Sequence, residues 1–247
     1  MNIGLVIGKK NSIGVPGKNI KLILGRPTAE YAFIAAKYAN IDKIFVSTDS
    51  NEIAMIGNKY NATHISRPKE LATPESLTED VLIHAFQEIT EQLPEDVKIK
   101  TITLLFCNNP AIDVYLLKEA IAFLNQTNEF DSCFSVAKYD MFSPARARSI
   151  DKYNEIKPFV DLKHIKNVSS IRNSQGSVYF CDLSIQVMKP ICFEDMDSGN
   201  LPFKWQGKRS KAIITDFGFD IDTEWQFVVI EHWLKKRGFT ETEIPWK

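Results

Sequence analysis

Cysteine is scarce in this chain, and its spacing argues against the common cross-linked frameworks. Four cysteines lie far apart in 247 residues, with no Cys-x-x-Cys pair among them. This pattern predicts reduced thiols and a cytoplasmic location rather than a disulfide or zinc framework. No apolar run approaches the roughly 18 residues of a membrane span. No charged leader precedes the first apolar run, so we expect neither a membrane partner nor a signal peptide.

An excess of charge of one sign is lacking as well. The 30 basic and 31 acidic residues leave a formal net charge of −1, so no nucleic-acid partner is expected. Internal repeats and low-complexity segments are also missing. A hydrophobic content of 44% is ordinary for a globular protein, and 247 residues suit one α/β domain with a full core. We therefore predict a single domain over residues 1–247.

What the chain does contain is an alternation of strand-like and helix-like segments. Short β-rich runs predict strands, and apolar residues three or four apart predict helices. The alternation favours a parallel sheet with covering helices, in which ligands bind beyond the carboxyl ends of the strands. The expected strands are residues 3–7, 43–49, 61–65, 101–106, 133–136, 176–180 and 211–214, and the expected helices are residues 27–40, 51–60, 78–91, 114–124 and 225–236.

A polar loop at residues 8–19 directly follows the strand at 3–7 and is made largely of glycine, asparagine, serine and lysine. Glycine lets backbone N–H groups approach an anion, and lysine supplies charge to phosphate oxygens. The loop matches neither the Walker loop nor the Gly-x-Gly-x-x-Gly pattern. The alternative is an ordinary glycine-rich turn. Asp49 ends a second strand at the same predicted edge, which favours a binding role.

Two carboxylates, Asp220 and Asp222, alternate along an extended segment before the last helix. Residues two apart in an extended chain face the same side. Such a pair is a compact ligand set for Mg²⁺, which prefers oxygen ligands and commonly shares them with substrate phosphates. Alternatively, Asp222 caps the helix, with Thr223 and Glu224 in its first turn.

The middle of the chain, at about residues 138–175, differs in character from the rest. It holds several basic residues among short polar turns and lacks a long periodic segment. This segment is either a plain surface excursion or an arm that docks on a partner subunit.

Four motifs together resemble the CMP-sialic acid synthetase (acylneuraminate cytidylyltransferase) family. They are the loop at residues 8–19, Val-Ser-Thr-Asp at 46–49, Arg-Pro-Lys-Glu-Leu-Ala at 67–72 and Asp-Ile-Asp-Thr-Glu at 220–224. Their order and spacing hold across nearly the whole chain. The sequence is therefore identified as a divergent member of this family.

The resemblance implies a Rossmann-like (GT-A-like) nucleotidyltransferase fold. Its sheet would be mixed but mainly parallel, with covering helices and a dimerisation arm. The implied reaction joins CTP to an acidic, nonulosonic or 3-deoxy-2-keto sugar, giving a CMP-sugar and pyrophosphate for surface glycan synthesis. The implied cofactor is Mg²⁺, and the implied partners are CTP, the acidic sugar and a second copy of the chain.

The resemblance also assigns roles to individual residues. The catalytic residues would be Lys9, Lys18, Asp220 and Asp222, the last two as ligands of Mg²⁺. The nucleotide-binding residues would be Gly8, Lys10, Asn11, Ser12, Gly14, Asn19, Asp49, Arg67, Ser76 and Thr78. The sugar-binding residues would be Asn108, Arg146, Lys166, Arg172 and Gln175.

The chain departs from the family pattern at the loop. Lys9 replaces an arginine, which keeps the charge but loses the bidentate fork. Ile13 replaces a lysine and removes a charge from the triphosphate site, for which the neighbouring Lys10 could compensate.

The chain also departs from the pattern at the sugar pocket. Phe106 and Ile112 replace a glutamine and an arginine that help to shape this pocket, and Gln175 stands where asparagine is usual. We therefore expect an acceptor other than N-acetylneuraminate. Cys107, in the same stretch, is expected to fill space.

Three further functions stay open at this point. The chain could use another acidic acceptor or another nucleotide, could be a non-catalytic nucleotide- or sugar-binding homologue, or could be a purely structural dimer. The retained Lys18, Asp220 and Asp222 favour an enzyme, because a binding module has no chemical need for the metal pair.

Overall fold

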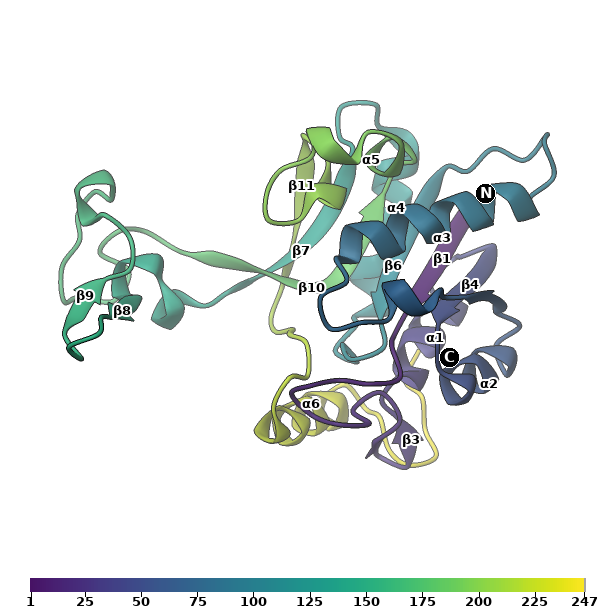
Figure 1. Cartoon of the computed structure of the whole chain (residues 1–247), viewed down its shortest axis with the longest axis horizontal. Helices are drawn as coiled ribbons and strands as arrows, with labels where there is room; N and C mark the ends of the chain where they lie inside the picture. Colours follow the sequence, from purple (N-terminus) through teal and green to yellow (C-terminus); the bar gives the residue numbers. More distant parts are fainter. Residues whose placement is uncertain (247) are drawn as a thin grey trace.

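The computed structural model describes residues 1–246 as a sheet-centred body from which a long arm projects (Figure 1). The strands are β1 (Asn2–Ile7), β2 (Leu22–Ile23), β3 (Arg26–Pro27), β4 (Lys43–Thr48), β5 (Thr63–Ser66), β6 (Thr101–Phe106), β7 (Ser132–Lys138), β8 (Arg148–Ile150), β9 (Ile156–Pro158), β10 (Tyr179–Met188) and β11 (Ser210–Thr215). The α-helices are α1 (Glu30–Tyr38), α2 (Asn51–Asn58), α3 (Thr78–Gln92), α4 (Val114–Gln126), α5 (Ile191–Glu194) and α6 (Glu224–Lys236).

Seven strands form the central sheet in the order β11-β7-β10-β6-β1-β4-β5. β10 runs antiparallel to both of its neighbours, and the other pairs are parallel. The mixed, mainly parallel sheet expected from the sequence is thus confirmed. In the register of β1, Ile7 lies opposite Phe106 of β6 and Ser47 of β4, so the segments that leave these strands start side by side.

Two hydrophobic cores form on the two faces of the sheet because side chains alternate along each strand. On β1, Ile3 and Leu5 pack into the core under α3, whereas Val6 packs into the core under α1, α2, α4 and α6. Among residues 1–246, no helix is both long and apolar enough to cross a bilayer.

The arm consists of residues 139–178 and is carried away from the body by the ends of β7 and β10 (Figure 1). Its own regular structure includes the β8–β9 hairpin. Large apolar side chains on the arm are 69–72% exposed, namely Ile150, Tyr153, Ile156, Phe159 and Ile171. The projecting segment coincides with the stretch expected at about residues 138–175.

Two elements differ from the sequence-based expectation. Pro27 lies in β3, and α1 begins only at Glu30, because Leu24 and Gly25 adopt positive φ and turn the chain so that Leu22 pairs with Pro27. β10 extends to Met188, where we expected a strand ending at residue 180 and a looser stretch after it. A bulge with Leu183 at φ 58 interrupts its apolar pattern and hides the strand in the sequence.

We predict that Phe134→Ala lowers the free energy of unfolding by about 3–5 kcal/mol. Phe134 is 1% exposed in the middle of β7, so truncation leaves a cavity between the sheet and α3 and α5. Ile214→Ala is the matched control on the edge strand β11, where the side chain is 64% exposed and should contribute little. Denaturant melts of both variants measure the difference, and equal losses would contradict this description of the core.

Candidate functional site

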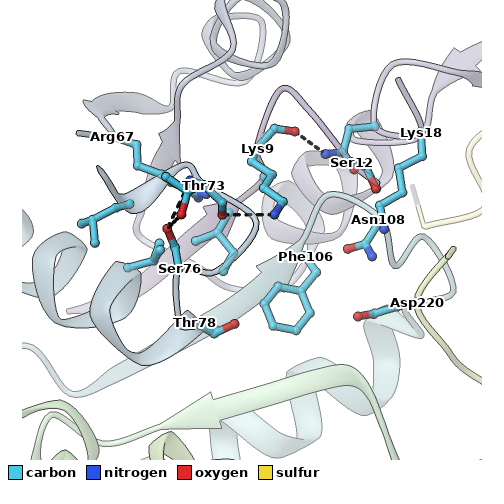
Figure 2. A pocket seen from close by; sticks show the side chains of 15 residues that line it. Lys9, Ser12, Lys18, Arg67, Thr73, Ser76, Thr78, Phe106, Asn108 and Asp220 are labelled. Carbon is cyan, nitrogen blue, oxygen red and sulfur yellow. Dashed lines mark hydrogen bonds between the residues drawn. The ribbon is translucent and has the colours of Figure 1, made fainter. Parts of the chain in front are cut away.

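A cavity of about 210 Å³ opens at the carboxyl ends of β1 and β6, where the sequence predicted a ligand site (Figure 2). Its polar wall combines lysines, an arginine, hydroxyls, amides and one carboxylate. The lining residues are Ile7, Gly8, Lys9, Ser12, Lys18, Asn19, Arg67, Leu71, Thr73, Ser76, Thr78, Val81, Phe106, Asn108 and Asp220.

Two glycines let the loop at residues 8–19 lie directly against its neighbours. A Cβ on Gly8 would come within 2.5 Å of the Cys107 sulfur, and a Cβ on Gly14 within 2.5 Å of the Asp222 carbonyl oxygen. A larger residue would have to displace the Cys107 side chain at the first position and the Asp222 backbone at the second. The loop therefore packs both on the end of β6 and on the acidic segment before α6.

Lys18 links the loop to the acidic segment by charge. Lys18 is 9% exposed, and its Nζ lies 2.6 Å from Oδ1 of Asp222. Asp222 is free for this contact because Thr223 caps α6, in a capping box with Gln226. The alternative that Asp222 serves as the helix cap is thus not supported.

Asp220 lines the cavity on the same side as Lys18 and Asn108, across from Ser76 and Thr78 (Figure 2). Burial and the nearby charge of Asp222 raise the pKa of Asp220 to about 7, against the opposing effect of Lys18. Asn109 donates a hydrogen bond of 3.1 Å from Nδ2 to Oδ1 of Asp220, and the Ile221 amide donates one of 2.8 Å to the Asn108 carbonyl. The charge of Asp222 therefore opposes ionisation of Asp220, while these two hydrogen bonds hold the segment that carries both carboxylates.

Arg67 and the loop that follows it form the other wall. Arg67 is 8% exposed and donates from its Nη2 to the Ser47 carbonyl at 2.7 Å. Burial lowers the pKa of this guanidinium, against the opposing effect of Asp49. Ser76 donates to the Glu70 carbonyl at 2.8 Å and so shapes the loop. This wall lines the cavity with a guanidinium group and with the hydroxyls of Thr73, Ser76 and Thr78.

Asn19 also lines the cavity. Its Nδ2 donates to the Lys9 carbonyl at 3.0 Å, while its Oδ1 is buried and has no partner among the described residues. A buried acceptor that lines a cavity is available for a donor on a ligand.

Other predicted site residues act around the cavity rather than in its wall. Asp49 accepts a hydrogen bond of 2.8 Å from the Lys10 amide and so shapes the loop from behind. Lys10 and Asn11 line a separate space between the loop and α2. Cys107 is 1% exposed behind Gly8, and burial raises its pKa to about 12, so it fills space as expected.

The predicted sugar-binding residues are divided between two places. Asn108 lines the cavity. Arg146, Lys166, Arg172 and Gln175 belong to the arm, which leads away from the body of the same chain (Figure 1). The fold therefore does not bring these four to the cavity of their own chain.

Sequence reasoning missed part of the cavity wall. Leu71 lies inside the motif at 67–72 and Thr73 directly after it, but neither is assigned a role from the sequence, and Lys9 Nζ lies 3.4 Å from the Thr73 carbonyl. The ring of Phe106 faces the cavity between Thr78 and Asp220 (Figure 2), although its position had been noted only as the loss of a glutamine. Leu71, Thr73 and Phe106 each lie in or next to a stretch named in the sequence analysis, and this proximity is the signal that could have identified them as cavity residues.

Comparison with known proteins gives three findings, which concern a family model, two related sequences and a solved structure. A sequence model of the family described as Cytidylyltransferase matches residues 3–149. The chain is 29% identical to a CMP-N,N'-diacetyllegionaminic acid synthase of Legionella pneumophila, over 72% of this chain and 76% of the relative. It is 26% identical to an N-acylneuraminate cytidylyltransferase of Escherichia coli over 66% of this chain but only 37% of that longer relative.

The third finding concerns solved structures. CMP:2-keto-3-deoxy-manno-octonic acid synthetase complexed with CTP matches with a TM-score of 0.65 at 12% identity, over 96% of this chain and 99% of that one. At this identity the match shows the fold, and it confirms the Rossmann-like nucleotidyltransferase architecture.

We predict that Asp220→Asn raises the thermal stability of the nucleotide-free protein at pH 8 in EDTA. The pKa of Asp220 rises from about 3.9 in an unfolded chain to about 7 in the fold. The folded state therefore binds more protons in this window, and wild-type stability falls as the pH rises from about 4 to about 7. The variant avoids this loss and should melt at least about 2–4 °C higher.

Scanning calorimetry at pH 4 and pH 8 measures the effect, which should nearly vanish at pH 4. Asp96→Asn, which changes an exposed carboxylate at the opposite end of the sheet, is the control. A lower melting temperature for Asp220→Asn at pH 8 would show that the negative charge of Asp220 stabilises the fold.

Proposed function

The chain belongs to the cytidylyltransferase family, and on that premise we propose that it transfers CMP from CTP to an acidic sugar of the nonulosonic, 3-deoxy-2-keto type. The product would be a CMP-sugar for surface glycan synthesis. One observation carries the proposal: Lys9 and Lys18 meet Asp220 in a single cavity at the carboxyl ends of the strands. The names of the relatives supply the acceptor class, because they are synthases of CMP-linked legionaminic and neuraminic acids.

The reaction forms a bond from a sugar hydroxyl oxygen to the α-phosphorus and breaks the bond from that phosphorus to pyrophosphate. The hydroxyl loses its proton. Such transfers depend on positioning and on neutralising charge. Lys9, Lys18 and the amides of the glycine-rich loop would hold the triphosphate. Arg67, Ser76 and Asn19 would hold the cytidine, and the oxygen of Asn19 would take a donor from it.

Asp220 and Asp222 would hold Mg²⁺. They fit this ion because carboxylate oxygens are its preferred donors, and because the pKa of Asp220, raised by burial and then by the charge of Asp222, marks a buried carboxylate that a cation would stabilise in its charged form. Within residues 1–246, no group of three or more His, Cys, Asp and Glu side chains could hold a metal, so water and the nucleotide would complete the ligand set. When bound, Mg²⁺ lowers the charge on the triphosphate and stabilises the leaving pyrophosphate.

The acceptor should differ from N-acetylneuraminate. Phe106 places an aromatic ring in the cavity wall beside Asn108, where the family pattern has a glutamine. Ile112 is 3% exposed and belongs to the core, so this position offers no charge to a sugar carboxylate. The basic groups for that carboxylate would come from the arm.

The arm supports a homodimer in which each arm reaches the cavity of the partner subunit. The exposed apolar side chains of the arm would be covered there. Arg146, Lys166 and Arg172 lie on the same arm and would then meet the sugar carboxylate. A cytoplasmic location is also proposed, and it is supported by the four cysteines, all of which are free thiols.

The function is tested by incubating the protein with CTP, Mg²⁺ and a panel of 3-deoxy-2-keto sugar acids. We expect pyrophosphate release with at least one acid, and less with N-acetylneuraminate. Pyrophosphate is measured by a coupled phosphate assay, with UTP and ATP in parallel. CTP binding without release from any acid or nucleotide would instead favour a non-catalytic binding protein.

Lys18→Met should lower kcat/KM by about 10²-fold or more, because it removes a buried charge from the proposed triphosphate site. Lys21→Met is the matched control, since Lys21 is near in sequence but pairs with Glu224 outside the cavity wall. Steady-state rates for the best acceptor give the comparison. Equal losses in the two variants would remove Lys18 from the proposed site.

The double variant Tyr153→Ser with Phe159→Ser should convert a dimer into a monomer. Both side chains lie on the arm and are 70–72% exposed, so they have apolar surface for a partner to bury. Light scattering after size exclusion should give twice the mass of one chain for the wild type. Met55→Ser on α2, where the side chain is 59% exposed, should stay dimeric. A monomeric wild type would contradict the dimer.

A further inference from the structure

A buried carboxylate outside the cavity accepts hydrogen bonds from three strands near the arm. Asp182 lies on β10 and is 4% exposed. One of its carboxylate oxygens accepts from the Ser135 hydroxyl and from the amide and hydroxyl of Ser184. Its other oxygen accepts from the Thr215 hydroxyl. β7, β10 and β11 thus meet at this one side chain, which we call the Asp182 hub.

Asn109 connects the Asp182 hub to the cavity. The residue is 1% exposed, and its Nδ2 donates both to the Asp182 carbonyl oxygen at 2.9 Å and to Oδ1 of Asp220 at 3.1 Å. A carbonyl oxygen can only accept, so the amide nitrogen must face this side. Both hydrogens of the amide are therefore used to tie Asp220 to β10.

The base of the arm holds the same acidic segment at a second point. Tyr139 follows β7 at the start of the arm, and its hydroxyl lies 3.3 Å from both the amide nitrogen and the carbonyl oxygen of Gly218. A Cβ on Gly218 would lie 2.9 Å from the Asp182 carboxyl carbon. The segment that leads to Asp220 therefore rests directly on the Asp182 hub.

We propose that Asn109 is a positioning residue that fixes the Asp220 carboxylate in the cavity and links its orientation to the base of the arm. The inference rests on the proposed function, in which Asp220 helps to hold a divalent cation. Asp220 is repelled by Asp222 and attracted by Lys18. A directed hydrogen bond from a fully buried amide restrains it against both forces.

The test uses Mn²⁺ as a probe, since electron paramagnetic resonance reports its binding without turnover. With CTP present and no acceptor, Asn109→Ala should weaken Mn²⁺ binding about 10-fold or more. Its kcat should fall by a similar factor while KM for CTP stays near the wild-type value, because the change acts on Asp220 rather than on the nucleoside wall. Asn109→Ser keeps one hydrogen-bond donor, so its Mn²⁺ affinity and kcat should lie between those of the wild type and those of Asn109→Ala.

The control is Asn125→Ala, which removes a 3.1 Å hydrogen bond from Nδ2 to Asn2 at the opposite end of the sheet. It should leave Mn²⁺ affinity and kcat unchanged. Unchanged Mn²⁺ affinity in Asn109→Ala, with or without a fall in kcat, would overturn the inference. Wild-type protein that binds no Mn²⁺ with CTP would overturn it together with the metal assignment.

A second pair of variants covers the case in which Asn109→Ala does not fold. Tyr139→Phe removes one hydroxyl from the base of the arm and should weaken Mn²⁺ binding to a smaller extent. Tyr60→Phe, which breaks a 2.8 Å hydrogen bond to Glu30, should have no effect. If Tyr139→Phe, like the control Tyr60→Phe, leaves Mn²⁺ binding unchanged, the orientation of Asp220 is not linked to the base of the arm. Since Mn²⁺ binding needs no acceptor, a failed pyrophosphate assay would leave this test intact.

Discussion

The ion pair between Lys18 and Asp222 is the contact on which the candidate site depends. It joins atoms 2.6 Å apart across 204 positions of sequence. The Lys18 side chain is 11% exposed and the Asp222 side chain 66%, so a nearly buried cation is neutralised by a carboxylate that solvent can reach. An unpaired charge at the lysine would be costly. In the proposed reaction, the triphosphate would compete with Asp222 for Lys18, and Mg²⁺ would compete with Lys18 for Asp222.

Close packing of backbone at two glycines makes this contact possible. Gly8 lies against Cys107 and Gly14 against the Asp222 carbonyl, at distances that no side chain would allow. The parallel register of β1 with β6 places the first of these contacts, since Ile7 pairs with Phe106. The replacement of a family lysine by Ile13 is compatible with this packing, because Ile13 is 79% exposed and takes no part in it.

The antiparallel strand β10 gives the fold its second feature, the arm. β7 and β10 are paired neighbours that run in opposite directions, so together they can leave the sheet and return. The same two strands supply Ser135 and Asp182 to the buried hub beneath the acidic segment. The arm and the proposed metal site therefore both rest on strands β7 and β10.

Sequence alone indicated most long strands and helices of the body, the polar loop, the acidic pair and the family, because periodicity and motif spacing are local properties of the chain. The family resemblance assigned Lys18, Arg67 and Asp220 to one site, and all three line the cavity at the carboxyl ends of β1 and β6.

Only the tertiary structure decided the antiparallel course of β10, the pairing of Lys18 with Asp222 and the bridging position of Asn109. Each of these depends on contacts between distant segments. In β10 the bulge at Leu183 masks the local pattern, and the neighbours of Asn109 are 73 and 111 positions away. Local patterns carry no information about such partners until strand order and register have brought them together.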